Sequence, residues 1–237
     1  MNYYFLLEDE QSLLKVLPQW LQYMEFKSTR VVDIDAVQEN NYVLQSGQGV
    51  TQLITRVLFQ TIDTILEKPG RIDKLVVILD SEEFTAEQRK QDVKEKIEGH
   101  YPNQKFDFDI TIVVCNHCFE TWLLGAKGLY PEHVEEESDF YPYYQYYNIA
   151  CDDPENMIPP ADRKETIAKY HFHYLHELLR YKKIRFSKSR PQNVATKKYF
   201  EDILERIETT EHIRSFAKFI DFVKLWNEMD LDKKDEN

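Results

Sequence analysis

The order of apolar and polar positions along the chain predicts strands that alternate with helices. The clearest segment is residues 74–83, where five consecutive apolar residues, three of them β-branched, precede three carboxylates within four positions. An unbroken apolar run is typical of a strand that is buried on both faces of a parallel sheet. Its carboxylates follow at the C-terminal end, which is the edge where open α/β sheets bind ligands.

Further elements follow from the same pattern. Apolar runs or alternation predict strands, spacing of three to four residues predicts helices, and the polar residues 35–50 predict a loop. The predicted strands are residues 2–7, 30–34, 74–80 and 106–115, and the predicted helices are residues 11–26, 53–66, 85–99 and one that begins at 119. This alternation favours an α/β fold with a mainly parallel sheet and right-handed crossovers.

The rest of the chain differs in character. Residues 127–161 combine clustered acids with five tyrosines between Tyr141 and Tyr147, and they predict a surface insertion. The tyrosines fit either an aromatic contact surface or packing within the insertion. Helical patterns follow over residues 162–182, 193–209 and 212–228. We therefore expect an α/β domain at residues 1–126, the insertion at 127–161, a C-terminal helical region at 162–229 and a charged tail at 230–237.

Composition narrows the class of protein. The chain has 237 residues, of which 42% are hydrophobic, and this is enough for one sizeable core. A net charge of −12 argues against a protein that coats nucleic acid nonspecifically. There is no apolar run of membrane-spanning length and no signal peptide pattern, so we expect no membrane association. Three cysteines favour a reduced, cytoplasmic protein over a disulfide framework.

Carboxylates end the predicted strands or begin the helices after them. They are Glu8, Asp80 with Glu82, and Glu120. Because parallel strands bring their C-terminal ends to one edge of a sheet, we expect these side chains to converge. A single acid at such a position often only caps a helix, and the two acids after Glu8 are interpreted in that way. Several acids on one edge favour a site for Mg²⁺ or Mn²⁺, or acid–base chemistry.

The order of these acids resembles the TOPRIM domain, the metal-binding fold of primases, type II topoisomerases and OLD-family nucleases. That pattern has an acid after the first strand and an Asp-x-acid pair, here Asp80-x-Glu82, after a later buried strand. Residues 116–124 are similar to the Cys-Phe-Glu-x-Trp-Leu-Leu segment of small stand-alone TOPRIM-like proteins of the RloB type. Residues 213–219 resemble the ending of related proteins. The resemblance covers mainly residues 1–125.

The resemblance implies a TOPRIM-like sheet of four or more strands and a Mg²⁺-dependent nuclease. Such proteins are often encoded beside ATPases in prokaryotic defence loci, so the implied function is an effector against phage or foreign nucleic acid. Asp80, Glu82 and Glu120 would hold metal, and Glu8 would bind metal or act as a general acid or base.

The chain departs from the family pattern at three positions. Asp9 stands where glycine is usual, Ser12 stands where a second acid is usual, and Glu82 replaces the second aspartate of the pair. These departures favour an alternative function, a non-catalytic TOPRIM-like sensor subunit that docks on an ATPase partner or on nucleic acid. A structural subunit of a DNA-handling machine and a homo-oligomer also stay open.

A basic segment interrupts the acidic chain. Residues 180–198 hold eight Lys or Arg residues and no acid, and Tyr181 and Phe186 lie among them. Basic and aromatic side chains together suit a phosphate backbone with stacked bases, so we expect DNA or RNA as a partner. A solvated helix end or an acidic protein partner is the alternative. The predicted nucleic-acid contacts are Lys182, Lys183, Arg185, Lys188 and Arg190.

Two other kinds of site receive less support. Cys115, His117 and Cys118, together with the histidines between 171 and 176, are zinc-ligand types. However, Cys115 ends an apolar strand, where a free cysteine is usually a small buried hydrophobe. The chain has no glycine-rich motif of the kind that binds nucleoside triphosphates.

Overall fold

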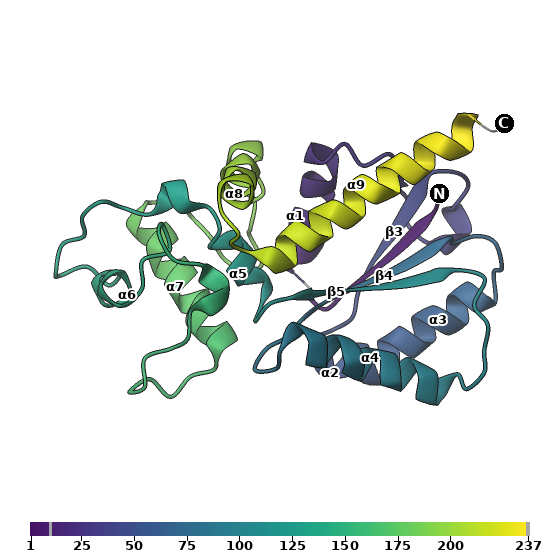
Figure 1. The fold of residues 1–237 in the computed structure, drawn as a ribbon, viewed down its shortest axis with the longest axis horizontal. Coiled ribbons are helices and arrows are strands. Elements are labelled where there is room, and N and C mark those ends of the chain that lie inside the picture. Colours follow the sequence, from purple (N-terminus) through teal and green to yellow (C-terminus); the bar gives the residue numbers. More distant parts are fainter. Residues whose placement is uncertain (10, 236–237) are drawn as a thin grey trace.

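Five parallel strands form one sheet in the order β2-β3-β1-β4-β5, with helices on both faces (Figure 1). The computed structural model describes residues 1–9 and 11–235. The strands are β1 Tyr3–Leu7, β2 Thr29–Arg30, β3 Asn41–Ser46, β4 Lys74–Asp80 and β5 Asp109–Cys115. The predicted parallel α/β sheet with a C-terminal helical region is confirmed, and the arrangement is consistent with a Rossmann-like or TOPRIM-like fold.

The helices divide between the two faces of the sheet because each apolar stripe packs on one of two buried clusters. On one face lie α2 Val50–Gln52, the π-helical turn η2 Leu53–Val57, α3 Leu58–Leu66 and α4 Ala86–His100. On the other lie α1 Ser12–Tyr23 and α9 Arg214–Asp235. The same buried cluster continues beyond the sheet into α5 Phe119–Leu123, α6 Tyr141–Tyr146, α7 Ile167–Tyr181 and α8 Lys197–Thr209. Short 3₁₀ turns are η1 Ile34–Ala36, η3 Lys127–Leu129 and η4 Pro154–Asn156. Among the described helices, none combines the length and the apolar character that a bilayer crossing needs.

The connection that leaves β1 runs toward β2, and the connection that leaves β4 runs the opposite way across the sheet, toward β5. Strand β1 lies between β3 and β4, and α1 leaves β1 toward one face while α3 and α4 cover the other. Leu7 pairs with Ile78, so the residues that follow both strands meet at the same edge. Helices α5, α7 and α8 lie beyond this edge of the sheet (Figure 1). In open parallel sheets such a switch point is where ligands bind.

Two sequence predictions on the outer side of β1 are wrong. The predicted loop at residues 35–50 contains β3, whose apolar core is only Tyr42, Val43 and Leu44 between polar neighbours. The predicted strand at 30–34 ends at Arg30, because Asp33 caps the turn η1 through the backbone N–H groups of residues 35 and 36. Three apolar residues are too few to display a strand period, whereas placement between β1 and β2 buries them.

Other boundaries differ by a few residues. The strand predicted at 106–115 begins at Asp109, and the helix predicted at 162–182 begins at Ile167. Thr166 ends the preceding loop by accepting a hydrogen bond from the N–H of Lys169, which is the geometry of a helix N-cap. The cap, not the apolar spacing, therefore fixes where α7 starts.

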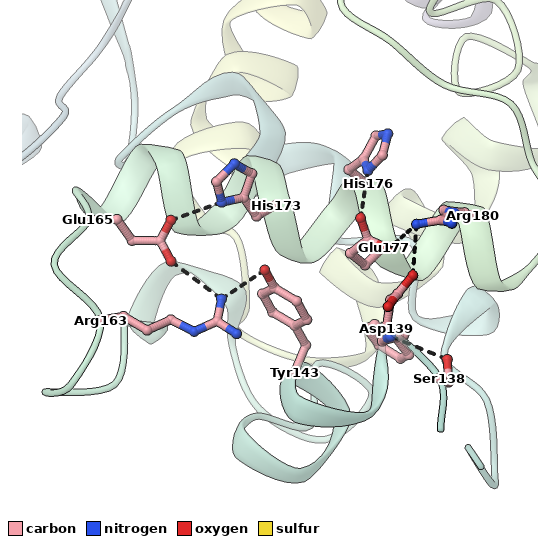
Figure 2. A network of polar contacts seen from close by, with 10 residues as sticks. Ser138, Asp139, Tyr143, Arg163, Glu165, His173, His176, Glu177 and Arg180 are labelled. Atoms are coloured by element: carbon pink, nitrogen blue, oxygen red, sulfur yellow. Dashed lines mark hydrogen bonds and ion pairs between the residues drawn. The ribbon is translucent and has the colours of Figure 1, made fainter. Parts of the chain in front are cut away.

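The insertion packs on α7. Phe140 and Tyr143 are buried in the apolar cluster that also holds Tyr170 and Tyr174. The guanidinium of Arg163 lies 4.5 Å from the centre of the Tyr143 ring and donates to its hydroxyl oxygen at 2.8 Å. Figure 2 shows the surrounding polar contacts, which join Glu165 to Arg163 and His173, and Arg180 to Asp139 and Glu177. For the buried tyrosines, packing within the insertion is the interpretation that the structure supports.

Candidate functional site

Two predicted site acids meet at the switch point between β1 and β4. The backbone N–H of Glu8 donates to the carbonyl oxygen of Ile78 at 2.8 Å, so pairing continues one residue past β1. The Oε2 atom of Glu8 then accepts a hydrogen bond from the N–H of Asp80 at 2.7 Å. The carboxylate of Glu8 therefore binds the last backbone N–H of β4, which belongs to Asp80.

The electrostatic environment of both carboxyls is unusual. Burial raises the pKa of Glu8 to about 7. The hydrogen bond from the N–H of Asp80 lowers this pKa, and the charge of Glu82 raises it further. Burial, and then the charges of Glu8 and Glu120, raises the pKa of Asp80 well above its ordinary value. Grouped carboxylates repel one another when they ionise, and a bound cation reverses that repulsion. Shifted groups of this kind are enriched at functional sites.

Glu120 brings a third carboxylate to this edge from the first turn of α5. Its side chain is 2% exposed, and its Oε1 atom accepts no hydrogen bond from the described residues. The ammonium Nζ of Lys188 lies 3.3 Å from that oxygen and forms an ion pair with it. We call Glu8, Asp80 and Glu120 the acid edge. A buried carboxylate oxygen without a hydrogen bond is costly, and it marks where a further cation would be stabilised most.

Glu82, in contrast, pairs with an arginine, although its charge still acts on Glu8. Its backbone is left-handed, with a φ of 54°, and its Oε2 atom lies 3.2 Å from the guanidinium of Arg89. Arg89 is buried on α4 and its guanidinium carbon lies 4.7 Å from the centre of the Phe84 ring. The structure thus brings together Glu8, Asp80 and Glu120 but pairs the fourth predicted acid with an arginine.

The acid that follows Glu8 starts a helix. The carboxylate of Asp9 accepts hydrogen bonds from the hydroxyl and backbone N–H of Ser12 and from the N–H of Gln11. The interpretation of Asp9 as a helix-start acid agrees with these contacts, and residue 10 lies outside the described residues. Glu83, at the other strand end, accepts a hydrogen bond from the N–H of Ile167 at 2.7 Å.

The hydrogen bonds that Asp9 accepts at the start of α1 give a stability prediction. We expect the free energy of unfolding of Asp9→Ala to be about 1 kcal/mol lower than that of Asp9→Asn. Asparagine keeps an oxygen that accepts hydrogen bonds from the N–H groups at the start of the helix. Both variants remove the same charge beside the acid edge, so their difference isolates these hydrogen bonds. Urea denaturation measures it, and equal free energies of unfolding in the two variants would contradict the assignment.

The basic segment divides into two parts. Lys182, Lys183, Arg185 and Arg190 are exposed between α7 and α8. Lys188 instead reaches the acid edge, where burial lowers its pKa but the charges of Glu120 and Asp9 outweigh that effect and raise it. Sequence reasoning placed Lys188 with the nucleic-acid contacts, because its partner lies far away in the chain and no local pattern marks the pair.

The zinc interpretation finds no support. Cys115 and Cys118 are buried, and the ring of His171 is held between the hydroxyl of Thr121 at 2.8 Å and the carbonyl of Met157 at 2.7 Å. Within residues 1–9 and 11–235, no three His, Cys, Asp or Glu side chains already surround a common point as metal ligands would. A divalent ion at the acid edge therefore requires side chains to turn toward it. The buried carboxylate of Glu120, which already attracts the Lys188 ammonium, fits such an ion.

Comparison of the chain with protein-family models, with curated proteins and with solved structures finds no match.

Proposed function

We propose that the chain is a TOPRIM-like nuclease that uses Mg²⁺ or Mn²⁺, and that it acts in the cytoplasm as an effector of prokaryotic defence. The observation that carries the proposal is the contact between two strand ends at the switch point, where Oε2 of Glu8 lies 2.7 Å from the N–H of Asp80. The resemblance in the order of acids, the raised pKa values of these two carboxyls and the buried carboxylate of Glu120 support it.

Each residue of the acid edge has a role in this proposal. Asp80 and Glu120 would hold the ion with carboxylate oxygens, and Glu82 would join them after leaving Arg89. A bound ion supplies an activated water and positive charge at the scissile phosphate. Glu8, whose pKa burial raises to about 7, can hold or release a proton near neutral pH.

A second function is favoured by the positive side chains at the site. Lys188 pairs with Glu120 and Arg89 pairs with Glu82, so two of the four predicted acids already have cationic partners. That arrangement suits a non-catalytic TOPRIM-like subunit that docks on nucleic acid or on an ATPase partner. The two functions share the fold and differ in whether phosphodiester bonds are cut.

Cleavage by the purified protein separates the two functions. The substrates are single-stranded DNA, double-stranded DNA and RNA, in Mg²⁺ or Mn²⁺, with the protein alone and with any ATPase encoded beside it. The nuclease proposal expects cleavage that EDTA abolishes. Binding without cleavage in every combination would contradict the nuclease and favour the docking subunit.

The exposed basic residues give a prediction about nucleic-acid binding. We expect the triple variant Lys182→Ala, Lys183→Ala and Arg185→Ala to weaken binding and to flatten its dependence on salt. Each lost phosphate contact removes about 0.7–0.9 from the slope of log affinity against log salt, so the triple variant loses about 2 to 3. Fluorescence anisotropy of a labelled oligonucleotide at several salt concentrations measures this slope.

A matched control removes the same charge elsewhere on the surface. Lys94→Ala, Lys105→Ala and Lys224→Ala change three exposed lysines outside the basic segment. Their slope should stay close to that of the wild type. If both triple variants bind alike, residues 182–185 do not contact the phosphate backbone.

A further inference from the structure

Lys188 stands where a metal ion would act. Its ammonium lies 3.3 Å from the Oε1 atom of Glu120, which is 2% exposed, while the Lys188 side chain is 51% exposed. The positive charge of Lys188 also opposes the rise in the pKa of Asp80, so it acts on two members of the acid edge. The ammonium of Lys188 is the cationic partner of this buried oxygen.

The turn that carries Lys188 is held by few contacts. Ser187 and Arg190 form an isolated antiparallel bridge, and Lys188 lies at the tip between them. From α1, the ammonium of Lys15 donates to the carbonyl oxygen of Ser189 at 2.7 Å. Lys188 itself adds a contact 5.5 Å from the centre of the Phe172 ring. The contact with Phe172 involves a side chain of α7, but none of these contacts belongs to the backbone hydrogen bonding of α7 or α8, so the tip can withdraw while both helices stay folded.

We propose that Lys188 is a tethered cation that occupies the acid edge when no metal is bound and competes there with a divalent ion. The inference rests on the proposed metal site and adds its regulation. Mg²⁺ approaches carboxylate oxygens to about 2.0–2.1 Å, closer and with more charge than the ammonium at 3.3 Å. An ion on Glu120 and the Lys188 ammonium repel each other, so one displaces the other.

Displacement of Lys188 couples two surfaces. The tip belongs to the exposed basic segment, and releasing it from Glu120 frees one more positive charge on that segment. Metal loading therefore increases the affinity for a polyanion, and by reciprocity a bound polyanion that attracts Lys188 increases the affinity for metal. The acid edge then loads its ion when nucleic acid is present.

Metal binding by variants of Lys188 tests the competition without an activity assay. Free Mn²⁺ is measured by electron paramagnetic resonance during titration of the wild type, Lys188→Met, Lys188→Arg and the control Lys198→Met, which removes an exposed charge on α8. We expect Lys188→Met to bind Mn²⁺ about tenfold more tightly than the wild type. Lys188→Arg and Lys198→Met should stay within about twofold of the wild type, because the first keeps a competing charge and the second never had one there.

A measurement on the wild type does not depend on any variant folding. Acetylation of Lys188, followed by mass spectrometry, should become faster when Mn²⁺ is added, while acetylation of Lys198 stays constant. Equal Mn²⁺ affinity in the wild type and Lys188→Met, with unchanged acetylation, overturns the competition and leaves the metal site standing. If neither the wild type nor any variant binds Mn²⁺, both the competition and the metal site are overturned. Mn²⁺ binding by Lys188→Met alone supports the competition.

Discussion

Asp80→Asn is expected to abolish metal-dependent cleavage while leaving the fold intact. Asp80 ends the central strand β4, and its carboxylate lies within the charge field of Glu8 and Glu120. Loss of a ligand at this point should lower the cleavage rate by more than about 100-fold, since even residues that only support metal ligands are worth 10–100-fold. Initial rates on a labelled oligonucleotide in Mn²⁺ measure the loss.

The same substitution should not destabilise the metal-free protein. Burial and neighbouring charges raise the pKa of Asp80 well above its ordinary value, so ionisation of this group costs folding free energy near neutral pH. Asparagine removes that cost, and the melting temperature in EDTA should stay equal or rise. The increase in melting temperature upon Mn²⁺ addition should shrink, because the folded state binds the ion less tightly.

Asp107→Asn is the matched control for Asp80→Asn. Asp107 is exposed in the loop before β5, at the opposite edge of the sheet, and it accepts a hydrogen bond from the N–H of Gly70 that asparagine can still accept. Its cleavage rate should equal that of the wild type. Cleavage that persists in Asp80→Asn would show that the assigned site is not where the chemistry occurs.

The sequence identified the strands that are long and apolar and missed the strand that is not. The five apolar residues of β4 have one structural explanation, burial on both faces, and they predicted it correctly. In β3 the burial of Tyr42, Val43 and Leu44 depends on neighbours on both sides, β1 and β2. No local pattern carries that information, because three apolar residues fit a loop as well as a strand.

In the site, too, the sequence shows what is local and not what depends on distant neighbours. That Glu8 and Asp80 share an edge follows from parallel strands, which the sequence predicts, but their adjacency requires β1 to lie beside β4, which only the strand order shows. The reach of Lys188 to Glu120 depends on packing between segments distant in the chain. Glu82 pairs with Arg89 across the turn that joins β4 to α4, and the shape of that turn is not marked by charge or spacing. Charge and spacing named the candidate residues without showing which of them pair.

His171 should make the protein less stable in acid. It is fully buried, and since a carbonyl only accepts, its Nε2–H donates to Met157 while Nδ1 accepts from the hydroxyl of Thr121. Burial lowers the pKa of His171 from 6.5 to about 3. Between those values the unfolded chain binds a proton that the folded chain does not, so this group lowers stability as the pH falls below 6.5.

Comparison with His171→Gln isolates that contribution. Glutamine keeps a donor and an acceptor but does not titrate, so the wild type should lose about 2 kcal/mol relative to this variant between pH 8 and pH 5. This direction is opposite to that of Glu8, whose pKa burial raises to about 7 and whose ionisation costs stability as the pH rises. Urea denaturation of both proteins at each pH measures the difference. A constant difference between wild type and His171→Gln across this range would mean that His171 is protonated alike in the folded and unfolded states.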